Sequence, residues 1–268
     1  MKILVITPTL GQSAWLAETV ATVAALPVVS RHILVCPATV RADLANRFPQ
    51  VQVVTEPGGG MYAAINAGLA AATGAWDAFT YINDDDLLLP GFVAHARRLE
   101  RAGPGPMMAY GNVKLIDDRG RRLGAIPVSP CPSLNRALYA QRLEPVYQHG
   151  TLVTRAALAA LRGFDDSFRF CGDSEFLARA CVAGVPFLRT GGRPVAAFRL
   201  RTDQLTKNRA AMLAERTKVD EKLGLLAPQP ALRRRWARLV FRTANLPVYA
   251  ERVARHGWVS FDELLAQS

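Results

Sequence analysis

The chain has 268 residues, of which 50% are hydrophobic and 21% charged, and it contains 20 glycines and 17 prolines. This composition is typical of a folded globular protein and excludes a mainly disordered chain, a collagen and a coiled coil. No apolar run approaches the roughly 18 residues that a membrane span needs, and the opening MKILVITPTL breaks at Pro8, too early for a secretory signal. We therefore expect a cytoplasmic protein.

The first part of the chain alternates strand patterns with helix patterns. Continuous apolar, β-branched runs predict strands over 2–7, 32–36, 51–55 and 78–82, and helical patterns separate them over 13–26, 42–48 and 61–72. Ser13 is placed to cap the first helix. This alternation implies right-handed crossovers between parallel strands of an α/β sheet.

Beyond Pro90 the alternation becomes less regular. The patterns predict a helix to about residue 102, a strand over 108–116, a hairpin-like turn over 117–120, a strand over 150–154, a helix from 155, another ending near 183 and a strand near 187. From about residue 205 the chain reads as helices, interrupted at Gly224 and at 228–230. We expect an α/β body over 1–204 and a basic helical region over 205–268.

The four cysteines are far apart in the sequence. Cys36, Cys131, Cys171 and Cys181 form no CxxC pair, and no histidine lies at zinc-finger distance. This spacing predicts buried free thiols rather than a disulfide framework or a zinc site.

Three loops with distinctive chemistry follow predicted strands. They are 7–11 (TPTLG), 56–60 (EPGGG) and 83–86 (NDDD). Open α/β sheets bind ligands outside the carboxyl ends of their strands, so these loops are candidates for one site. Adjacent carboxylates repel one another unless solvent or a cation neutralises them, and their hard oxygens suit Mg²⁺ or Mn²⁺ carrying a phosphorylated substrate. A solvated acidic turn that caps the next helix is the alternative.

Two further patterns allow more than one interpretation. Gly58, Gly60 and Ala63 fit the G-x-G-x-x-A spacing of a dinucleotide-binding turn, but the turn follows the third strand rather than the first, and an ordinary left-handed turn is the alternative. The segment CGDSEF places Asp173 and Glu175 at a helix start, where Asp173 either caps the helix or acts as a general base. Positions i and i+2 do not share a helix face, so at most one of the two does chemistry.

Other chemistries find little support in the sequence. The motifs of a serine hydrolase, a P-loop protein and an HExxH metalloprotease are absent, and we interpret His149 in QHGT as structural. The basic tail carries no zinc-finger or RNA-binding signature, so we expect no nucleic-acid partner.

The positive charge is concentrated near the C-terminus. Of the net charge of +11, residues 199–256 supply +9, from 14 Lys and Arg against 5 Asp and Glu. In this segment Leu232, Trp236, Leu239 and Val240 fall on one face of a predicted helix, with arginines elsewhere. This pattern fits docking to an anionic membrane surface, and it fits no less well an ordinary solvated helix packed on the body.

Four segments, in this order, resemble those of the inverting family-two glycosyltransferases of the GT-A fold, over about residues 1–200. They are ITPTL, EPGGGMYAAINAGLAAATG, YINDDDLLLPG and QHGTLVTRAALAALRGFDDSFRFCGDSEFLARA. The resemblance implies a three-layer α/β/α fold with a mostly parallel sheet and a C-terminal helical appendage. It also implies a hexosyltransferase-type enzyme that moves a sugar from a nucleotide-diphosphate sugar to a hydroxyl of a polysaccharide, a glycolipid or a secondary glycan.

The resemblance also assigns roles to residues. Asp173 would be the general base, and Asp85 and Asp86 would be the DxD-type ligands of Mg²⁺ or Mn²⁺, which acts as a Lewis acid on the leaving diphosphate. The residues that would line the donor side are Thr7, Pro8, Thr9, Glu56, Tyr62, Asn66, Asn83, Asp84 and Asp85.

Two departures from the family leave the donor undefined. Residues 35–39 (VCPAT) replace an acidic loop that usually follows the second strand, and Gly58 stands where many members have an aspartate. We predict a metal-dependent, inverting transferase that acts on a glycan or lipid-linked acceptor, in the cytoplasm or peripherally at the inner face of the membrane. The alternatives are an NAD(P)-linked oxidoreductase using Gly58, Gly60 and Ala63, and a non-catalytic sugar-nucleotide-binding protein.

Overall fold

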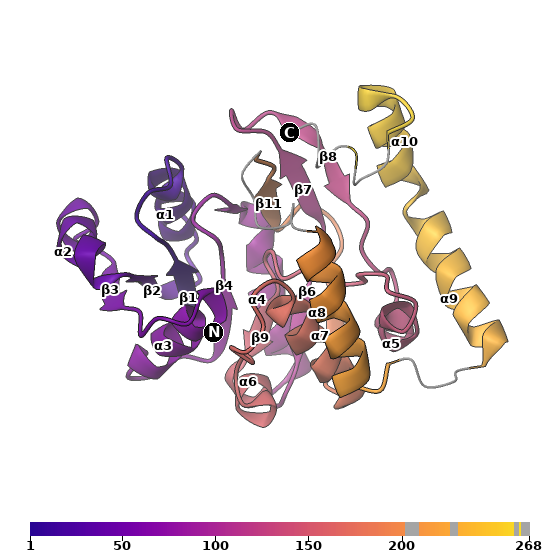
Figure 1. The fold of residues 1–268 in the computed structure, drawn as a ribbon, viewed down its shortest axis with the longest axis horizontal. Helices are drawn as coiled ribbons and strands as arrows, with labels where there is room; N and C mark the ends of the chain where they lie inside the picture. The colour runs from indigo at the N-terminus through magenta and orange to yellow at the C-terminus, as the bar shows by residue number, and fades with distance from the viewer. Residues whose placement is uncertain (202–208, 226–229, 260–262, 264–268) are drawn as a thin grey trace.

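Two sheets form the frame of the protein, and helices cover both faces of the larger one (Figure 1). A computed structural model describes residues 1–201, 209–225, 230–259 and 263. The larger sheet has the strand order β10-β6-β9-β4-β1-β2-β3, and the smaller sheet has the order β5-β11-β7-β8.

The larger sheet is mostly parallel. Its strands are β1 (Ile3–Pro8), β2 (Val29–Cys36), β3 (Gln52–Thr55), β4 (Ala78–Tyr81), β6 (Met108–Tyr110), β9 (Leu152–Thr154) and β10 (Phe187–Arg189). Only β9 runs antiparallel to its neighbours β4 and β6. Because β1 pairs with β2 on one side and with β4 on the other, the strand order reverses at β1. Such a reversal opens a crevice at the carboxyl ends of the two strands.

The smaller sheet lies beside this crevice and joins distant parts of the chain. Its strands are β5 (Leu87–Leu88), β7 (Val113–Ile116), β8 (Arg122–Ile126) and β11 (Ala196–Arg199). β5 directly follows the acidic segment 83–86, and it pairs with β11 in antiparallel register. The acidic segment is therefore held between the two sheets.

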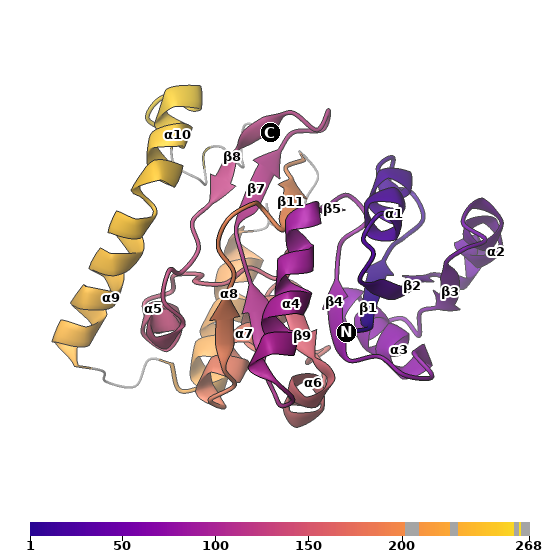
Figure 2. The same cartoon turned by 180° about the vertical axis from the view of Figure 1, so that it is seen from behind.

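Helices pack on both faces of the larger sheet because its strands are apolar on both faces. Leu4 and Ile6 of β1 belong to the same apolar cluster as α3 and α7, whereas Ile3 and Val5 pack in a second cluster with α4. Figure 2 shows α4 on the side opposite to α7 and α8. The helices are α1 (Leu16–Ala24), α2 (Ala38–Arg47), α3 (Met61–Ala71), α4 (Val93–Ala102), α5 (Asn135–Tyr139), α6 (Arg155–Leu161), α7 (Gly172–Val182), α8 (Arg209–Lys222), α9 (Ala231–Ala244) and α10 (Leu246–His256).

Two predicted elements differ from those observed. The single strand predicted over 108–116 is wrong, because the chain breaks after Tyr110 and β6 and β7 belong to different sheets. Gly111 stands at the break, where a Cβ atom would lie only 2.8 Å from Val195 Cγ1. The prediction that Ser13 caps the first helix is wrong, because that helix begins at Leu16 with Trp15 at its N-cap position. The Ser13 hydroxyl accepts from the Trp15 N–H at 3.3 Å and donates to the backbone carbonyl of Asp84 at 2.8 Å. The strand β11 was not predicted.

The basic C-terminal region contributes three helices to the part that the structure describes. Val219 of α8 and Leu225 after it lie in the apolar cluster that includes β1, so α8 is packed into the body. By contrast, α9 rests on α5, and α10 contacts β8 (Figure 1). The predicted boundary at 204/205 and the predicted interruption at 228–229 lie outside the described residues. The four cysteines are free. Cys36 and Cys171 are buried, as predicted, whereas Cys131 and Cys181 are only partly buried, so the prediction of a buried thiol is wrong for these two.

Candidate active site

Two of the predicted loops meet at the crevice between β1 and β4. The two strands pair in parallel register, from Ile3 opposite Ala78 to Ile6 opposite Tyr81. Just beyond them, Thr9 Oγ1 donates a 2.6 Å hydrogen bond to Asp84 Oδ2. The third loop follows β3, which is the edge strand of the sheet and lies two strands away from β1.

Asp86 is fully buried, and protein donors approach both of its oxygens. Oδ1 accepts a 2.8 Å hydrogen bond from the backbone N–H of Arg199. Oδ2 accepts a 3.0 Å bond from Asn83 Nδ2 and lies 3.3 Å from His149 Nε2. A buried carboxylate needs such partners to offset the loss of hydration, so the contacts of Asp86 are those of a residue that shapes the loop.

Asp85 has a different environment. Its Oδ2 forms an ion pair with Arg201 Nη1 at 3.0 Å, and the side chain is nearly buried. The pKa of Asp85 is raised to about 7, and burial is the largest cause. The carboxylates of Asp86 and Asp84 raise this pKa further, whereas the charge of Arg201 lowers it. An additional cation at this carboxylate would therefore stabilise its charged form.

Arg199 ties the acidic segment to the smaller sheet. Its guanidinium is buried, with Nε donating to the Asp85 carbonyl at 2.8 Å and Nη2 donating to Glu18 at 2.7 Å. Nη1 donates to two backbone carbonyls in the turn between β7 and β8. Neither Arg199 nor Arg201 could be identified from the sequence, because nothing local marks an arginine whose partner lies more than a hundred residues away.

Asp173 lies in the first turn of α7. The N-cap of that helix is Cys171, so the interpretation of Asp173 as the cap is wrong. Its Oδ1 accepts hydrogen bonds from the Ser174 backbone N–H at 2.8 Å and from the Tyr62 hydroxyl at 3.2 Å. Burial, the largest cause, raises the pKa of Asp173 above its usual range.

The neighbouring acid, Glu175, has contacts that fit a structural role. It is fully buried and pairs with Arg179 at 2.8 Å and with Lys222 of α8 at 2.7 Å. Asp173 and Glu175 therefore point into different surroundings, as their spacing on the helix predicts.

Tyr62 reaches Asp173 because Gly172 has no side chain. A Cβ atom at Gly172 would lie 2.6 Å from ring atoms of Tyr62, closer than real contacts allow. The tyrosine ring is buried under this glycine, and its hydroxyl is thereby held beside the carboxylate. Glycine at this position lets the helix start and the ring approach closely.

A hollow beside Asp173 contains polar atoms without partners. Its lining residues are Phe79, Tyr81, Gln148, Thr151, Val153, Phe164, Asp173, Phe176 and Leu177. Within the described part of the chain, the buried Tyr81 hydroxyl and Gln148 Oε1 have no hydrogen-bond partner, and neither does Asn83 Oδ1 in the acidic segment. His149 acts electrostatically on both Asp173 and Asp85. Unpaired buried polar atoms are costly, and at about 10 Å³ the hollow has room for a water molecule or a single hydroxyl group that could bond to them.

A carboxylate from α8 holds the turn that precedes Asp173. Glu215 accepts hydrogen bonds of 2.7 to 2.9 Å from three consecutive backbone N–H groups, those of residues 169–171. On the same helix Arg216 pairs with Glu144, which also accepts a bond from Ser174 Oγ. The basic C-terminal region thus contributes directly to the geometry at the start of α7. No local feature of the sequence predicted these contacts.

Several of the residues predicted to line the donor side form contacts within the protein. Thr7 Oγ1 lies 3.0 Å from His32 Nε2. Asn66 donates to the Phe164 carbonyl at 2.8 Å and accepts from its N–H at 3.1 Å, which fastens the GFDD loop to α3. Pro8 and Glu56 are partly exposed at the ends of their strands.

The glycine run before α3 adopts the left-handed conformation. Gly58, Gly59 and Gly60 have φ angles of 86°, 97° and 97°. Other residues adopt these angles at a cost, so the shape of the turn by itself accounts for the glycines.

Solved structures share this fold. S. aureus TarS 1–349 in complex with UDP-GlcNAc superimposes with a TM-score of 0.64 at 14% identity, over 95% of this chain and 79% of that chain. A longer TarS chain gives a TM-score of 0.61 at 14% identity, over 98% of this chain and 44% of that chain. Glucosyl-3-phosphoglycerate synthase from Mycobacterium tuberculosis, in complex with Mn²⁺, UDP and phosphoglyceric acid, gives a TM-score of 0.55 at 17% identity, over 86% of this chain and 80% of that chain.

These likenesses concern the fold. They confirm the prediction of a mixed α/β protein of the GT-A type with a central, mostly parallel sheet. Neither a known protein family nor a curated protein matches the sequence.

Proposed function

We propose that this protein is an inverting glycosyltransferase that uses a nucleotide-diphosphate sugar and has Asp173 as its general base. The observation that carries the proposal is a half-buried carboxylate with a raised pKa, Asp173, in the same region as the acidic segment at the switch point of a GT-A-type sheet. Similar solved structures contain UDP-GlcNAc in one case and UDP with Mn²⁺ in another, which supports a nucleotide-sugar donor.

The chemistry follows from the contacts of Asp173. Its carboxylate would take the proton of an acceptor hydroxyl while that oxygen bonds to the anomeric carbon of the sugar. The bond from that carbon to the diphosphate breaks, and its electron pair leaves with the nucleoside diphosphate. Attack from the side opposite to the leaving group inverts the configuration. A raised pKa makes Asp173 a stronger base than an exposed aspartate, and the Tyr62 hydroxyl orients it.

The residues present fit a divalent cation at Asp85 better than at Asp86. Both oxygens of Asp86 meet protein donors. Among the described residues, the side chain of Asp85 is bonded through Oδ2 alone, and Asn83 Oδ1 is buried and unpaired. No three His, Cys, Asp or Glu side chains in that part of the chain converge on one point. Mg²⁺ commonly binds through one or two carboxylates plus substrate phosphates, which such a site provides. When bound, Mg²⁺ or Mn²⁺ would neutralise charge on the leaving diphosphate.

The structure of the loops supports a division between donor and acceptor sides. We assign the donor to Thr9, Asn83, Asp84 and Asp85 at the switch point, and the acceptor hydroxyl to the hollow beside Asp173. We propose that the acceptor is a glycan or a lipid-linked sugar and that the reaction contributes to the synthesis of a polysaccharide or glycolipid. We propose the inner face of the membrane as its location.

The test compares Asp173→Asn with Asp166→Asn. Asp166 is an exposed carboxylate in the same GFDD loop, so the control removes the same charge nearby. We expect Asp173→Asn to bind UDP with Mn²⁺ as the wild type does and to lose turnover of UDP-sugars by about 10²- to 10⁴-fold. Unchanged turnover would contradict the proposal and favour a non-catalytic binding protein, and NAD(P) binding without a divalent ion would favour an oxidoreductase.

A further inference from the structure

The outer face of α9 exposes three large apolar side chains. On its inner side the helix packs against α5 through Ala237 and Phe241. The exposed fractions of its outer apolar residues, and of the first residue of α10, are 80% for Leu232, 57% for Trp236, 54% for Leu239 and 60% for Leu246. At 100° per residue the first three form one stripe, opposite the two packed residues. Val240, predicted for this stripe, is partly buried.

The stripe belongs to a helix that is fixed to the body. Asn245, at the end of α9, is buried and bonds through its side chain to both the N–H and the carbonyl of Val128, at 3.1 and 3.0 Å. The apolar face is therefore held outward rather than being free to fold back onto the protein. In Figure 1, α9 and α10 form the edge of the molecule opposite to β3 and α2.

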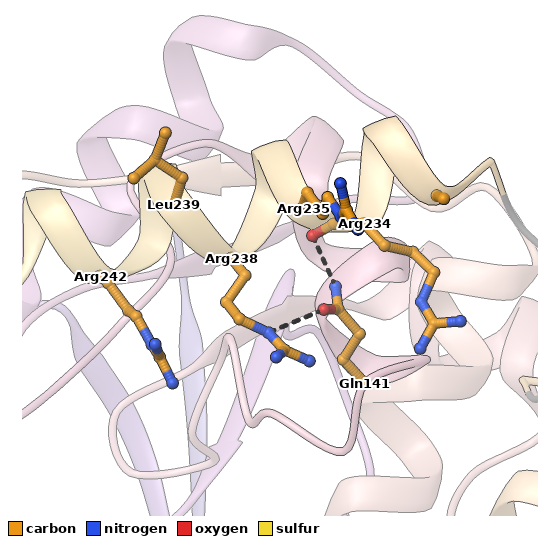
Figure 3. Close-up of a pocket in the computed structure, with 7 residues that line it drawn as sticks. Gln141, Arg234, Arg235, Arg238, Leu239 and Arg242 are labelled. Atoms are coloured by element: carbon orange, nitrogen blue, oxygen red, sulfur yellow. Dashed lines mark hydrogen bonds between the residues drawn. The ribbon is translucent and has the colours of Figure 1, made fainter.

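Arginines border the stripe. Arg234, Arg235, Arg238 and Arg242 line a groove of about 370 Å³ beside Gln141, in the turn that follows α5. Figure 3 shows Arg238 and Arg242 extending to the side of Gln141, while Leu239 points away from it. Arg238 Nε donates to Gln141 Oε1 at 3.0 Å. Together α9 and α10 carry seven arginines and one glutamate, a net charge of +6 with histidine neutral.

We propose that the outer face of α9, with the start of α10, is a docking surface for an anionic lipid membrane. Its tryptophan and leucines would enter the boundary between headgroups and acyl chains, and its arginines would meet the lipid phosphates. A helix that lies in this boundary combines an apolar stripe with a flanking basic face, as α9 does. The docking surface uses none of the residues assigned to catalysis.

Charge and apolarity together select the lipid surface over other partners. A second copy of this chain would bring two strongly positive faces together, which opposes self-association. A soluble polyanion would match the arginines but would leave Leu232, Trp236 and Leu239 in water. Among the described residues, no helix has the length and apolarity that crossing a bilayer requires.

Co-sedimentation of the full-length protein with vesicles tests the proposal without any activity measurement. One set of vesicles is phosphatidylcholine alone, and the other is phosphatidylcholine and phosphatidylglycerol in equal amounts. We expect binding to the anionic vesicles only. Each basic residue near such a surface contributes about fivefold, so the triple variant R235Q/R238Q/R242Q should bind on the order of 100-fold more weakly. Trp236→Ser combined with Leu239→Ser should weaken binding more than about tenfold.

The matched control removes three exposed arginines of α4, on another part of the surface. R97Q/R98Q/R101Q loses the same charge and should bind anionic vesicles within about twofold of the wild type. All of these side chains are exposed, so the thermal unfolding midpoint should not change. Equal binding to both kinds of vesicle, or an equal loss in the α4 variant, overturns the proposal.

Two further outcomes would replace it with a different partner. Binding of soluble polyphosphate that survives the change at Trp236 and Leu239, without vesicle binding, would identify a polyanion site. A dimer that protects Trp236 from a soluble quencher would identify a second copy of the chain.

Discussion

Replacing Glu215 by glutamine tests whether α8 positions the turn before Asp173. The carboxylate accepts two backbone N–H groups on Oε2 and one on Oε1, all at 2.7 to 2.9 Å. The side-chain oxygen of a glutamine can still accept from the N–H groups of Phe170 and Cys171. Its NH₂ group then faces the N–H of Arg169, and two donors cannot bond to each other. A hydrogen bond to a charged group contributes about 1.5 to 3 kcal/mol, and the two remaining bonds lose the charge. Because Glu215 is partly exposed, we expect the free energy of unfolding to fall by about 2 to 3 kcal/mol.

The assay pairs urea unfolding with turnover of a UDP-sugar. Glu221→Gln is the control, since Glu221 is exposed on the same helix and loses the same charge. We expect Glu215→Gln to lower kcat more than it raises KM for the donor, because the displaced group is the base and not the donor loop. If the two variants are alike in both stability and kcat, the turn is not held by Glu215 and the reasoning fails.

Three other changes probe the same region. Because the pKa of Asp173 is raised in the folded protein, the folded state binds a proton at this carboxyl more tightly than the unfolded chain does. The ionised carboxylate therefore lowers stability as the pH rises above the pKa of the unfolded chain. In a thermal scan Asp173→Asn should melt at a higher temperature than the wild type at pH 7, and the difference between the two melting temperatures should close toward pH 4. Wild-type kcat should also fall on acidification at a higher pH than an exposed aspartate would give, and an acid limb at the ordinary value would contradict this. Gly172→Ala should cost about 1 to 3 kcal/mol in urea and reduce turnover by displacing Tyr62, whereas Gly191→Ala, where a Cβ meets nothing closer than 3.9 Å, should be neutral. Asp85→Asn should weaken Mn²⁺ binding, followed by electron paramagnetic resonance, by at least about tenfold, and unchanged affinity would exclude Asp85 as a ligand.

The parts of the fold that sequence could predict are those encoded locally. In the run KILVIT the four central residues are all apolar, so both faces of the strand are apolar. This is the pattern of a strand covered by helices on both sides, and β1 is such a strand. The acidic segment was predictable for a similar reason, since it stands directly after an apolar run that ends β4.

The parts that sequence could not predict depend on contacts between distant residues. Nothing near Arg199 or Arg201 shows that they meet the acidic segment, and nothing near Glu215 shows that it bonds to residues 169–171. The break at Gly111 was hidden for a related reason. The apolar pattern continues across it, and only the close approach of Val195 shows where the chain changes sheets.

The hydrogen bond between Asp86 and the Arg199 backbone affects the order in which parts of the protein can fold during synthesis. The two residues are 113 positions apart, and β5, which directly follows the acidic segment, pairs with β11. During synthesis the first four parallel strands can associate early, but the segment after β4 lacks these partners until β11, at Ala196–Arg199, has left the ribosome. A nascent chain that stops short of β11 would therefore carry an ordered sheet beside an unfinished candidate site.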